Sequence, residues 1–291
     1  MSLDVVRTHL GAPAYERDGV LIYQGDSLEL LRKLPSSWLD STVTSPPYNI
    51  GKEYETKLDL QEYLQWVESW AVEIGRISSE SAHFWLNLGY VEVKGQGRAV
   101  PLPYLLWDKV PFYLRQEVVW AYGAGTTTSR AFAPRNEKFL WYVKDPDSYY
   151  FDLDSVRDPD VKYPNQRKNG KLKCNPLGKN PGDVWNIPKV TSGRQRASKE
   201  RMPHPAQFPE AVIERIILST TRPGDVVLDP FLGSGTTAAV AGRLGRRSVG
   251  FELRSDYLGT AIQRLDRMFD DRAALLAGVD DGELIRVDRA G

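Results

Sequence analysis

Apolar runs and amphipathic stretches alternate along most of the chain, and this pattern predicts an α/β protein. Short runs rich in β-branched and aromatic residues predict strands, whereas apolar positions that recur every three or four residues predict helices. The strands that the pattern predicts are Gly19–Gln24, Trp38–Thr44, Ala82–Leu88, Asp225–Asp229 and Ser248–Phe251. The helices that it predicts are Ser27–Leu34, Leu60–Ile74, Pro101–Trp107, Pro209–Leu218 and Tyr257–Met268.

Two further segments are expected to complete the sheet. Gln116–Trp120 and Lys138–Lys144 are both apolar runs, and we expect them to pair as an antiparallel hairpin. Asp183–Trp185 is expected to be a short structural return to the sheet. Beyond Asp270 the sequence is polar, so we expect a peripheral cap there.

The segment Val43–Asn49 contains two prolines followed by an aromatic ring. A strand cannot continue through Pro46 and Pro47, because neither residue donates a ladder hydrogen bond. The chain must therefore leave the sheet at Ser45, as a rigid loop that displays a hydroxyl, backbone carbonyls and the ring of Tyr48. Such a loop suits the exocyclic amine of a nucleobase that has left its stack. On this segment alone, an ordinary turn at the end of a strand is the alternative.

A second loop follows a strand far downstream, at Asp229-Pro-Phe231-Leu-Gly233-Ser-Gly235-Thr236. Its glycines let a ligand approach the backbone and good helix formers follow, so we expect a strand, a loop and a helix that cradle a nucleotide. The acid Asp229 suits a cationic ligand such as S-adenosylmethionine better than a pyrophosphate. Glu252, after the next apolar strand, stands where an acid holds a ribose diol in such folds.

Together these segments carry a resemblance to a known family. Ser45-Pro46-Pro47-Tyr48 and Asp229-Pro-Phe231-Leu-Gly233-Ser-Gly235 resemble loops of the amino-methyltransferases that modify DNA bases on an exocyclic nitrogen. Asp183–Pro188, His204–Pro209 and Glu252–Tyr257 stand in the family's order and spacing, so the resemblance covers nearly the whole chain. Because the catalytic loop precedes the cofactor loop, the chain is similar to the β group of this family.

The resemblance implies a Rossmann-like, S-adenosylmethionine-dependent methyltransferase fold. It implies a circularly permuted, mostly parallel sheet of seven strands with an antiparallel hairpin. We expect a catalytic half at 1–148, an inserted target-recognition region at 149–203 and a cofactor-binding half at 204–291. The expected catalytic residues are Ser45, Pro46, Pro47 and Tyr48, and the expected cofactor contacts are Asp26, His204, Asp229, Phe231, Gly233, Gly235, Thr236 and Glu252.

Two of these cofactor residues need comment. Asp26 could accept a hydrogen bond from the adenine amino group of the cofactor or cap the helix that begins at Ser27, and the resemblance favours the cofactor. By resemblance, the turn at His204 borders the methionine end of the cofactor. Family members often carry Thr and Lys where this chain has Ala206 and Phe208, so a hydroxyl contact at that turn does not carry over.

Composition and length favour an enzyme of the cytoplasm. With 291 residues the chain can bury a full core, and its single cysteine, Cys174, excludes a disulfide framework. No apolar run has the length of a membrane span, and the N-terminus lacks the apolar core of a signal peptide. The three histidines have no clustered partners, so we expect no metal.

The formal charge is zero, but the charges are unevenly spread. Residues 157–201 hold twelve Lys or Arg and four Asp or Glu, so this segment carries +8 and the rest of the chain −8. Concentrated positive charge predicts contact with DNA phosphates, with a solvated basic loop as the alternative. Because Arg, Lys and Gln side chains also read base edges, the residues expected to bind DNA are Arg167, Lys168, Arg194, Gln195 and Arg196.

Within the resemblance, one residue bears on the target base. Family members that methylate adenine N6 mostly carry Asp where this chain has Ser45, and those that methylate cytosine N4 mostly carry Ser. The chain therefore resembles most the cytosine-N4 enzymes of restriction-modification systems. A hydroxyl also both donates and accepts, which suits the amine and the neighbouring N3 of cytosine. We expect a flipped cytosine in duplex DNA to be methylated by direct in-line transfer, with adenine N6 as the alternative.

Other functions stay open on the sequence. The chain could be a nucleic-acid-binding subunit without catalysis, an oxidoreductase that uses its glycine loop for NAD, or a methyltransferase of RNA. Covalent catalysis at cytosine C5 is disfavoured, because Cys174 lies in a basic loop unlike the setting of a nucleophile. As partners we expect double-stranded DNA and, from the habits of the family, a restriction endonuclease and a homodimer, but no membrane.

Overall fold

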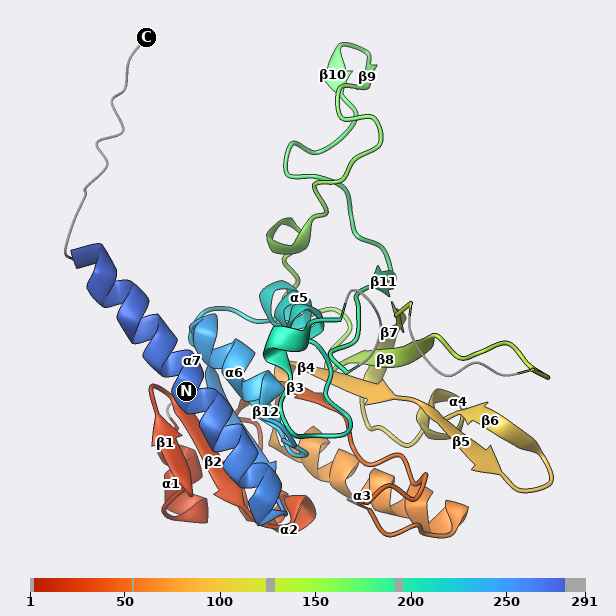
Figure 1. Ribbon diagram of the computed structural model, residues 1–291, viewed down its shortest axis with the longest axis vertical. Coiled ribbons are helices and arrows are strands. Elements are labelled where there is room, and N and C mark those ends of the chain that lie inside the picture. The colour runs from red at the N-terminus through yellow and green to blue at the C-terminus, as the bar shows by residue number, and fades with distance from the viewer. Residues whose placement is uncertain (1–2, 54, 124–128, 192–195, 281–291) are drawn as a thin grey trace.

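The computed structural model describes residues 3–53, 55–123, 129–191 and 196–280, and a mixed sheet forms its centre (Figure 1). Nine strands are hydrogen-bonded in the order β1-β2-β13-β12-β3-β4-β8-β7-β11. Their bounds are β1 Tyr15–Arg17, β2 Val20–Gln24, β3 Leu39–Thr44, β4 Ser78–Leu88, β7 Tyr113–Ala121, β8 Asn136–Val143, β11 Val184–Asn186, β12 Val226–Asp229 and β13 Arg247–Glu252.

The middle of this sheet is parallel and one side is antiparallel. β2, β13, β12, β3 and β4 are parallel neighbours, whereas β8 runs antiparallel to both β4 and β7. The α/β fold and the hairpin predicted from the sequence are therefore confirmed. Strands in the middle are buried on both faces: along β4, Phe84 and Leu86 join one apolar cluster and Trp85 joins another.

The sheet has nine strands, whereas the resemblance implied seven, and its two outermost strands, β1 and β11, are each three residues long. β1 forms because Asp18 and Gly19 have φ of 45° and 83°, the backbone of a two-residue hairpin turn that pairs β1 with β2. β11 is the expected return of Asp183–Trp185 to the sheet, where it adds in parallel to β7. The circular permutation stays a prediction.

Helices cover both faces of the sheet (Figure 1). Residues of α1, α2, α3 and α4 share one apolar cluster with β4 and β12, whereas α5, α6 and α7 contribute to the clusters on the other face. The helices are α1 Asp4–Leu10, α2 Ser27–Lys33, α3 Leu60–Ile77, α4 Pro103–Leu106, α5 Glu210–Thr220, α6 Thr236–Arg243 and α7 Ser255–Asp280.

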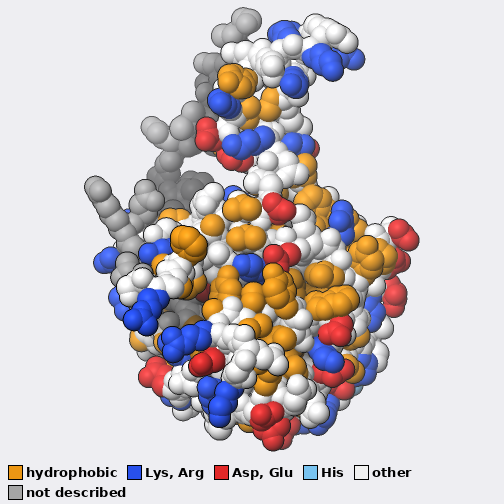
Figure 2. All heavy atoms as spheres, turned by 90° about the vertical axis from the view of Figure 1, so that its right-hand side faces the viewer, with side chains coloured by type: hydrophobic (Ala, Val, Ile, Leu, Met, Phe, Trp, Pro, Cys, Tyr) orange, Lys and Arg blue, Asp and Glu red, His pale blue; other side chains and the backbone are white. Residues whose placement is uncertain are grey.

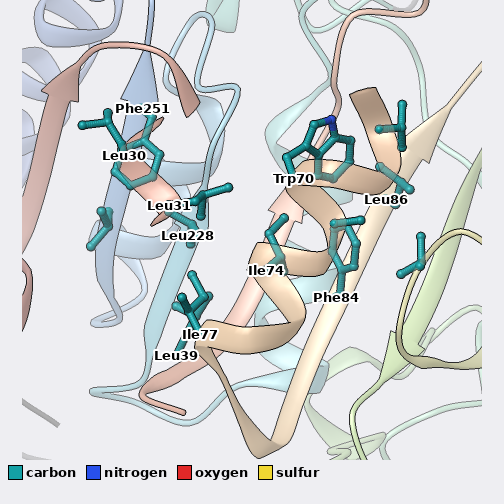
Figure 3. Packing of buried hydrophobic residues seen from close by; sticks show 14 of the residues in the cluster. Leu30, Leu31, Leu39, Trp70, Ile74, Ile77, Phe84, Leu86, Leu228 and Phe251 are labelled. Carbon is teal, nitrogen blue, oxygen red and sulfur yellow. The ribbon is translucent and has the colours of Figure 1, made fainter. Parts of the chain in front are cut away.

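The amphipathic stretch that starts at Leu60 forms α3, as predicted. Asp59 and Glu62 close its N-terminus in a capping box. On its buried face, Trp70 packs edge-on against Phe84 of β4, with ring centroids 6.3 Å apart (Figure 3). This helix therefore supports the strands whose ends carry the candidate site.

Two helices differ in length from the prediction. α4 is a single turn, because Pro101 belongs to a small hairpin formed by β5 (Tyr90–Val93) and β6 (Gly97–Pro101). α7 extends well past the expected end at Met268, since the following segment contains three Ala and two Leu, which are good helix formers. Among the described helices, none combines the length and the apolar character that a membrane span requires.

Residues 157–183 form an arm that projects from the rest of the molecule (Figures 1 and 2). At its tip β9 (Arg167–Lys168) pairs with β10 (Lys171–Leu172). At its base Asp158 and Lys179 are joined by a backbone bridge and by an ion pair of 3.1 Å. Lys and Arg side chains gather on this projection, most of whose residues are exposed. The arm therefore contributes basic surface to the molecule and few residues to its hydrophobic core.

Candidate active site

A cavity of about 240 Å³ lies at the carboxyl ends of β3, β12 and β13. Because β12 lies between β3 and β13, the loops that follow these strands emerge side by side, although they are far apart in sequence. Both loops singled out from the sequence line this cavity. The predicted site residues among its lining are Asp26, Ser45, Pro46, Pro47, Tyr48, His204, Phe231, Gly233, Thr236 and Glu252.

Hydrogen bonds and packing hold the loop that follows β3. The Tyr63 hydroxyl on α3 donates to the Pro47 carbonyl oxygen over 2.8 Å. The Tyr48 ring lies against Gly89, where an added Cβ would come within 2.8 Å of the ring. The hydroxyl oxygens of Ser45 and Tyr48 are 3.0 Å apart. The loop thus presents two adjacent hydroxyls to the cavity from a supported backbone.

Asn87, near the end of β4, binds both of these hydroxyls. Its Oδ1 accepts from the Tyr48 hydroxyl over 2.8 Å and from the Ser45 hydroxyl over 3.2 Å. Its Nδ2 donates to the Lys138 carbonyl oxygen over 3.1 Å, which fixes the orientation of the amide. Asn87 was not predicted from the sequence. The available signal was an amide inside an apolar strand, because a buried amide requires partners.

Glu137, at the start of β8, is a second lining residue that the sequence analysis did not single out. Its Oε2 accepts from the Tyr48 hydroxyl and its Oε1 from the Tyr122 hydroxyl, each over 3.3 Å. Lys189 Nζ lies 3.7 Å from Oε1 and 3.7 Å from the centre of the Tyr122 ring. Burial raises the pKa of the Glu137 carboxyl, and Lys189 with the two hydroxyls opposes that rise.

The loop after β12 forms a cradle. Gly233 has a φ of +53°, and an added Cβ would lie 2.9 Å from His204 Nε2, so both backbone and space require glycine. The Gly233 N–H donates to Glu252 Oε2 over 2.8 Å, and the Arg254 N–H donates to Oε1 over 2.9 Å. Burial raises the pKa of the Glu252 carboxyl. Backbone donors therefore orient this carboxyl toward the cavity, and each oxygen keeps a further lone pair.

Asp229 lies beneath this loop and is only 1% exposed, away from the cavity lining. Its Oδ1 accepts from the Thr44 hydroxyl over 2.7 Å and from the Phe231 N–H over 3.1 Å. Burial raises the pKa of Asp229 to about 6. These bonds join the end of β3 to the start of the cofactor loop. Gly235 is likewise outside the lining, and with a φ of 76° it precedes the first turn of α6.

Aromatic rings surround the cradle. Phe231 packs on Trp70 with ring centroids 5.2 Å apart, and His204 packs on Tyr257 at 4.5 Å. His204 Nδ1 accepts the Ala206 N–H over 3.2 Å, and burial lowers the pKa of His204 to about 4. The imidazole is therefore neutral at pH 7, with its hydrogen on Nε2. Flat, uncharged rings beside a glycine loop suit a nucleoside.

Asp26 and Thr236 lie where helices begin. Asp26 caps α2 by accepting the Glu29 N–H over 3.0 Å, which confirms one of the two alternatives, and it also lines the cavity. Its contact with a cofactor stays a prediction. The Thr236 hydroxyl, at the start of α6, accepts from Arg264 Nη1 over 2.8 Å. Both side chains thus contribute to local structure at the cavity edge.

The residues expected to bind DNA lie apart from the cavity lining. Arg167 and Lys168 are exposed on β9, at the tip of the arm. Arg196 is exposed just before a short 3₁₀ turn at Ser198–Glu200. Arg194 and Gln195 lie outside the described residues. The structure therefore puts part of the predicted DNA contacts on a projection and part on the segment between β11 and α5.

A mostly parallel α/β sheet with a glycine cradle and an acceptor-rich pocket at its carboxyl edge defines a Rossmann-like methyltransferase fold of the S-adenosylmethionine-dependent class. The model of the DNA methylase family that covers N6 and N4 enzymes matches residues 39–263, and the chain belongs to this family.

Named relatives span 84–90% of the chain. Type II methyltransferase M.ScaI of Streptomyces caespitosus is 63% identical over 261 residues, which cover 90% of this chain and 86% of that protein. DNA adenine methyltransferase YhdJ of Escherichia coli (strain K12) is 31% identical over 270 residues, which cover 90% and 87% of the two chains. Type II methyltransferase M.BglII of Bacillus subtilis is 39% identical over 252 residues, which cover 84% of this chain and 68% of that protein.

Solved structures share the fold. The PvuII DNA methyltransferase, called cytosine-N4-specific, matches with a TM-score of 0.68 at 24% identity and covers 92% of this chain and 96% of its own. A DNA modification methylase of Thermus thermophilus, solved in complex with S-adenosyl-L-methionine, matches with a TM-score of 0.59 at 24% identity and covers 85% and 93%.

Proposed function

We propose that this chain is a sequence-specific DNA methyltransferase that transfers a methyl group from S-adenosylmethionine to N4 of cytosine in duplex DNA. The observation that carries the proposal is that one cavity joins the Ser45–Tyr48 loop to the Gly233 cradle. An amine held by the first loop and a nucleoside held by the second meet inside it. Named relatives act on DNA, and the family covers both N4 and N6 enzymes.

The cradle fits S-adenosylmethionine. Gly233 leaves the space that a Cβ would fill, the Phe231 ring offers a flat apolar face, and the oriented Glu252 carboxylate can accept from two ribose hydroxyls. Asp26 lines the same cavity, and in this proposal its carboxylate accepts from the adenine amine. When bound, S-adenosylmethionine supplies an electrophilic methyl group on a sulfonium centre.

Ser45 acts as a hydrogen-bond acceptor for the target amine. Its own hydrogen has acceptors in Asn87 Oδ1 and the Tyr48 oxygen, so lone pairs of Oγ are left for an amine N–H. The Pro46 carbonyl oxygen can accept the second amine hydrogen. Two such bonds favour a pyramidal amine with its lone pair directed at the methyl group. Direct in-line transfer then depends on positioning and electrostatics, with no covalent enzyme intermediate.

One feature supports cytosine over adenine. In the family that the chain resembles, serine at the position of Ser45 belongs mostly to cytosine-N4 enzymes. Lys189 Nζ is a donor in the cavity that can meet the ring acceptor beside the amine, but it does not choose the base, because cytosine N3 and adenine N1 are both such acceptors. Adenine N6 is the second candidate, because the relative YhdJ is a DNA adenine methyltransferase.

The base must leave the duplex to reach this cavity. We propose that Tyr48 stacks on the flipped cytosine while the arm and the segment after β11 hold the DNA backbone. Arg167, Lys168 and Arg196 are exposed and basic, as phosphate and base-edge contacts require. Arg194 and Gln195 belong to the same proposal.

Mass spectrometry of nucleosides tests this function. The protein is incubated with DNA from a methylation-free host and S-adenosylmethionine, and the DNA is digested to nucleosides. We expect N4-methyldeoxycytidine in the wild type and little of it in Tyr48→Ala. N6-methyldeoxyadenosine would replace the proposal with its alternative, and methylation of RNA alone would overturn it.

Three further features belong to the same proposal. A restriction endonuclease that cuts the sequence methylated by this chain is proposed as its partner, because M.ScaI and M.BglII are Type II methyltransferases. A homodimer is proposed from the family resemblance, and a cytoplasmic location from the composition of the chain. Cleavage protection of plasmid DNA, sedimentation and cell fractionation test these points one by one.

A further inference from the structure

We infer that Glu137 takes up the proton that methyl transfer releases, by way of the hydroxyl groups of Ser45 and Tyr48. The inference rests on the proposed function, and it assigns a role to an acid that the transfer step leaves unused. Four observations carry it: a continuous run of hydroxyls, a carboxylate at its end, a cation beside that carboxylate, and partial exposure of the carboxyl group.

Methylation of an exocyclic amine leaves one proton to be removed. The nitrogen forms a bond to the methyl carbon while the carbon–sulfur bond breaks with its electron pair on sulfur. The nitrogen then carries two hydrogens, the methyl group and a positive charge. Loss of one hydrogen as a proton restores the neutral methylated amine, so the reaction is complete when a base has accepted that proton.

The described contacts provide a path for this proton. Ser45 Oγ, which accepts from the amine, lies 3.0 Å from the Tyr48 oxygen, and the Tyr48 oxygen lies 3.3 Å from Glu137 Oε2. Ser45 takes the amine proton and passes its own hydrogen to Tyr48, whose hydrogen passes to Glu137. Each hydroxyl ends as it began, and the carboxylate becomes a carboxylic acid.

Glu137 is the partner suited to end this path. Asn87 Oδ1 accepts from the same two hydroxyls, but an amide oxygen is too weak a base to take up a proton. The Glu137 side chain is 20% exposed, so it can return the proton to solvent after transfer. Glu137 thus completes a cycle without any change in the hydroxyls.

The groups that face Glu137 come from three elements. Tyr48 follows β3, Tyr122 follows β7, and Lys189 follows β11, while Arg135, two residues before Glu137, acts electrostatically on Tyr122. Burial raises the pKa of Glu137, and the positive charge of Lys189 opposes that rise. Because the ionised form is the acceptor, the rate of transfer falls as pH falls through this pKa.

The test compares Glu137→Gln with Glu117→Gln in single-turnover methylation. Glu117 is an exposed acid on the neighbouring strand β7 and serves as the matched control. We expect Glu137→Gln to slow methylation about 10²-fold, the lower range of general acid–base effects, and to abolish the acid limb of the pH–rate profile. Glu137→Asp keeps a carboxyl group, and we expect it to keep that limb.

A double-mutant cycle with Tyr48→Phe separates a relay from two independent effects. Tyr48→Phe keeps the ring and removes the hydroxyl, so it interrupts the same path. We expect the double variant to be no slower than the slower single variant, because either substitution alone already interrupts the path. If the rate losses of the two single variants multiply in the double variant, the two residues act independently and the relay is overturned.

Binding measurements distinguish an effect on the transfer step from an effect on ligand binding or folding. Affinity of Glu137→Gln for S-adenosylmethionine and for DNA, measured by calorimetry, is expected to equal that of the wild type, as is its melting temperature. A wild-type rate and pH profile in Glu137→Gln would overturn the inference while leaving the proposed function intact. Absence of DNA methylation by the wild type would overturn the proposed function itself.

Discussion

At the scale of single residues, Asn87 shapes what Ser45 can offer. Its amide is held by the Lys138 carbonyl, so its oxygen faces Ser45 and Tyr48 and accepts their hydrogens. A serine hydroxyl turned in this way acts toward a ligand as an acceptor. The chemistry of the loop after β3 therefore depends on a side chain from the next strand of the sheet.

Tyr48→Ala tests the aromatic platform. Removal of the ring is expected to cost roughly 1–3 kcal/mol of base stacking, and turnover should fall accordingly. Affinity for S-adenosylmethionine should change little, because the cradle of Gly233 does not depend on this ring. Steady-state kinetics beside cofactor titration measure the two effects, and unchanged turnover would remove Tyr48 from the site.

Gly233→Val tests the cradle. The added side chain meets His204 Nε2, for which a Cβ alone would lie at 2.9 Å, and the φ of +53° disfavours a β-branched residue. We expect loss of cofactor binding with DNA binding largely kept. Gly259→Val on α7 is the control, because a Cβ there meets nothing within 4 Å. Equal cofactor affinity in both variants would contradict the assignment.

Asp229→Asn tests what the buried carboxyl does. Its bonds to Thr44 and Phe231 predict that it positions the cofactor loop. The variant should then bind S-adenosylmethionine and its neutral product, S-adenosylhomocysteine, more weakly than the wild type does, with affinity reduced by the same factor for both ligands. A loss confined to the cationic ligand would show instead that the charge of Asp229 acts directly on the sulfonium, as the sequence suggested.

At the scale of elements, the sequence predicted correctly those helices and loops whose formation depends on neighbouring residues in the chain. The helix from Leu60 was readable from its apolar spacing, and the loop at Ser45 from two prolines that no strand tolerates. Asn87 and Glu137 could not be predicted as site residues, because their partners depend on the pairing of β8 with β4 and with β7. The edge strand β1 was missed although Asp18–Gly19 is a hairpin signal.

The arm makes a prediction of its own. Reversal of charge at Arg167 and Lys168, on its tip, should weaken DNA binding and reduce the slope of log affinity against log salt by about 2 if each residue contacts one phosphate. Lys33→Glu on α2, which lies on the side of the molecule away from the arm, is the control (Figure 1). A slope equal to that of the wild type would mean that the tip of the arm is merely solvated.

At the scale of the whole molecule, strand order creates the site. The sheet places β12 beside β3, so the Ser45–Tyr48 loop and the Gly233 loop, from opposite halves of the chain, share one cavity. The sequence predicted both loops and the hairpin, but it did not predict that the Asp229 carboxyl is buried beneath the loop and outside the cavity lining. That difference arises because the depth of a side chain depends on the covering loops, and local sequence does not encode it.

Ligand binding to the folded chain provides a prediction at this scale. At 100 times its dissociation constant, a ligand stabilises the folded state by about 2.7 kcal/mol. We expect S-adenosylmethionine to raise the melting temperature by several degrees and NAD to leave it unchanged. Calorimetric scans with each ligand measure this difference. Stabilisation by NAD alone would favour the oxidoreductase alternative.

Base-resolution sequencing of DNA tests the central claim most directly. DNA of a methylation-free host is sequenced before and after expression of this chain by a method that distinguishes N4-methylcytosine from N6-methyladenine. The account predicts N4-methylcytosine at one cytosine within one recurring sequence. Methylated adenine in a recurring sequence, with cytosine unmodified, would contradict it.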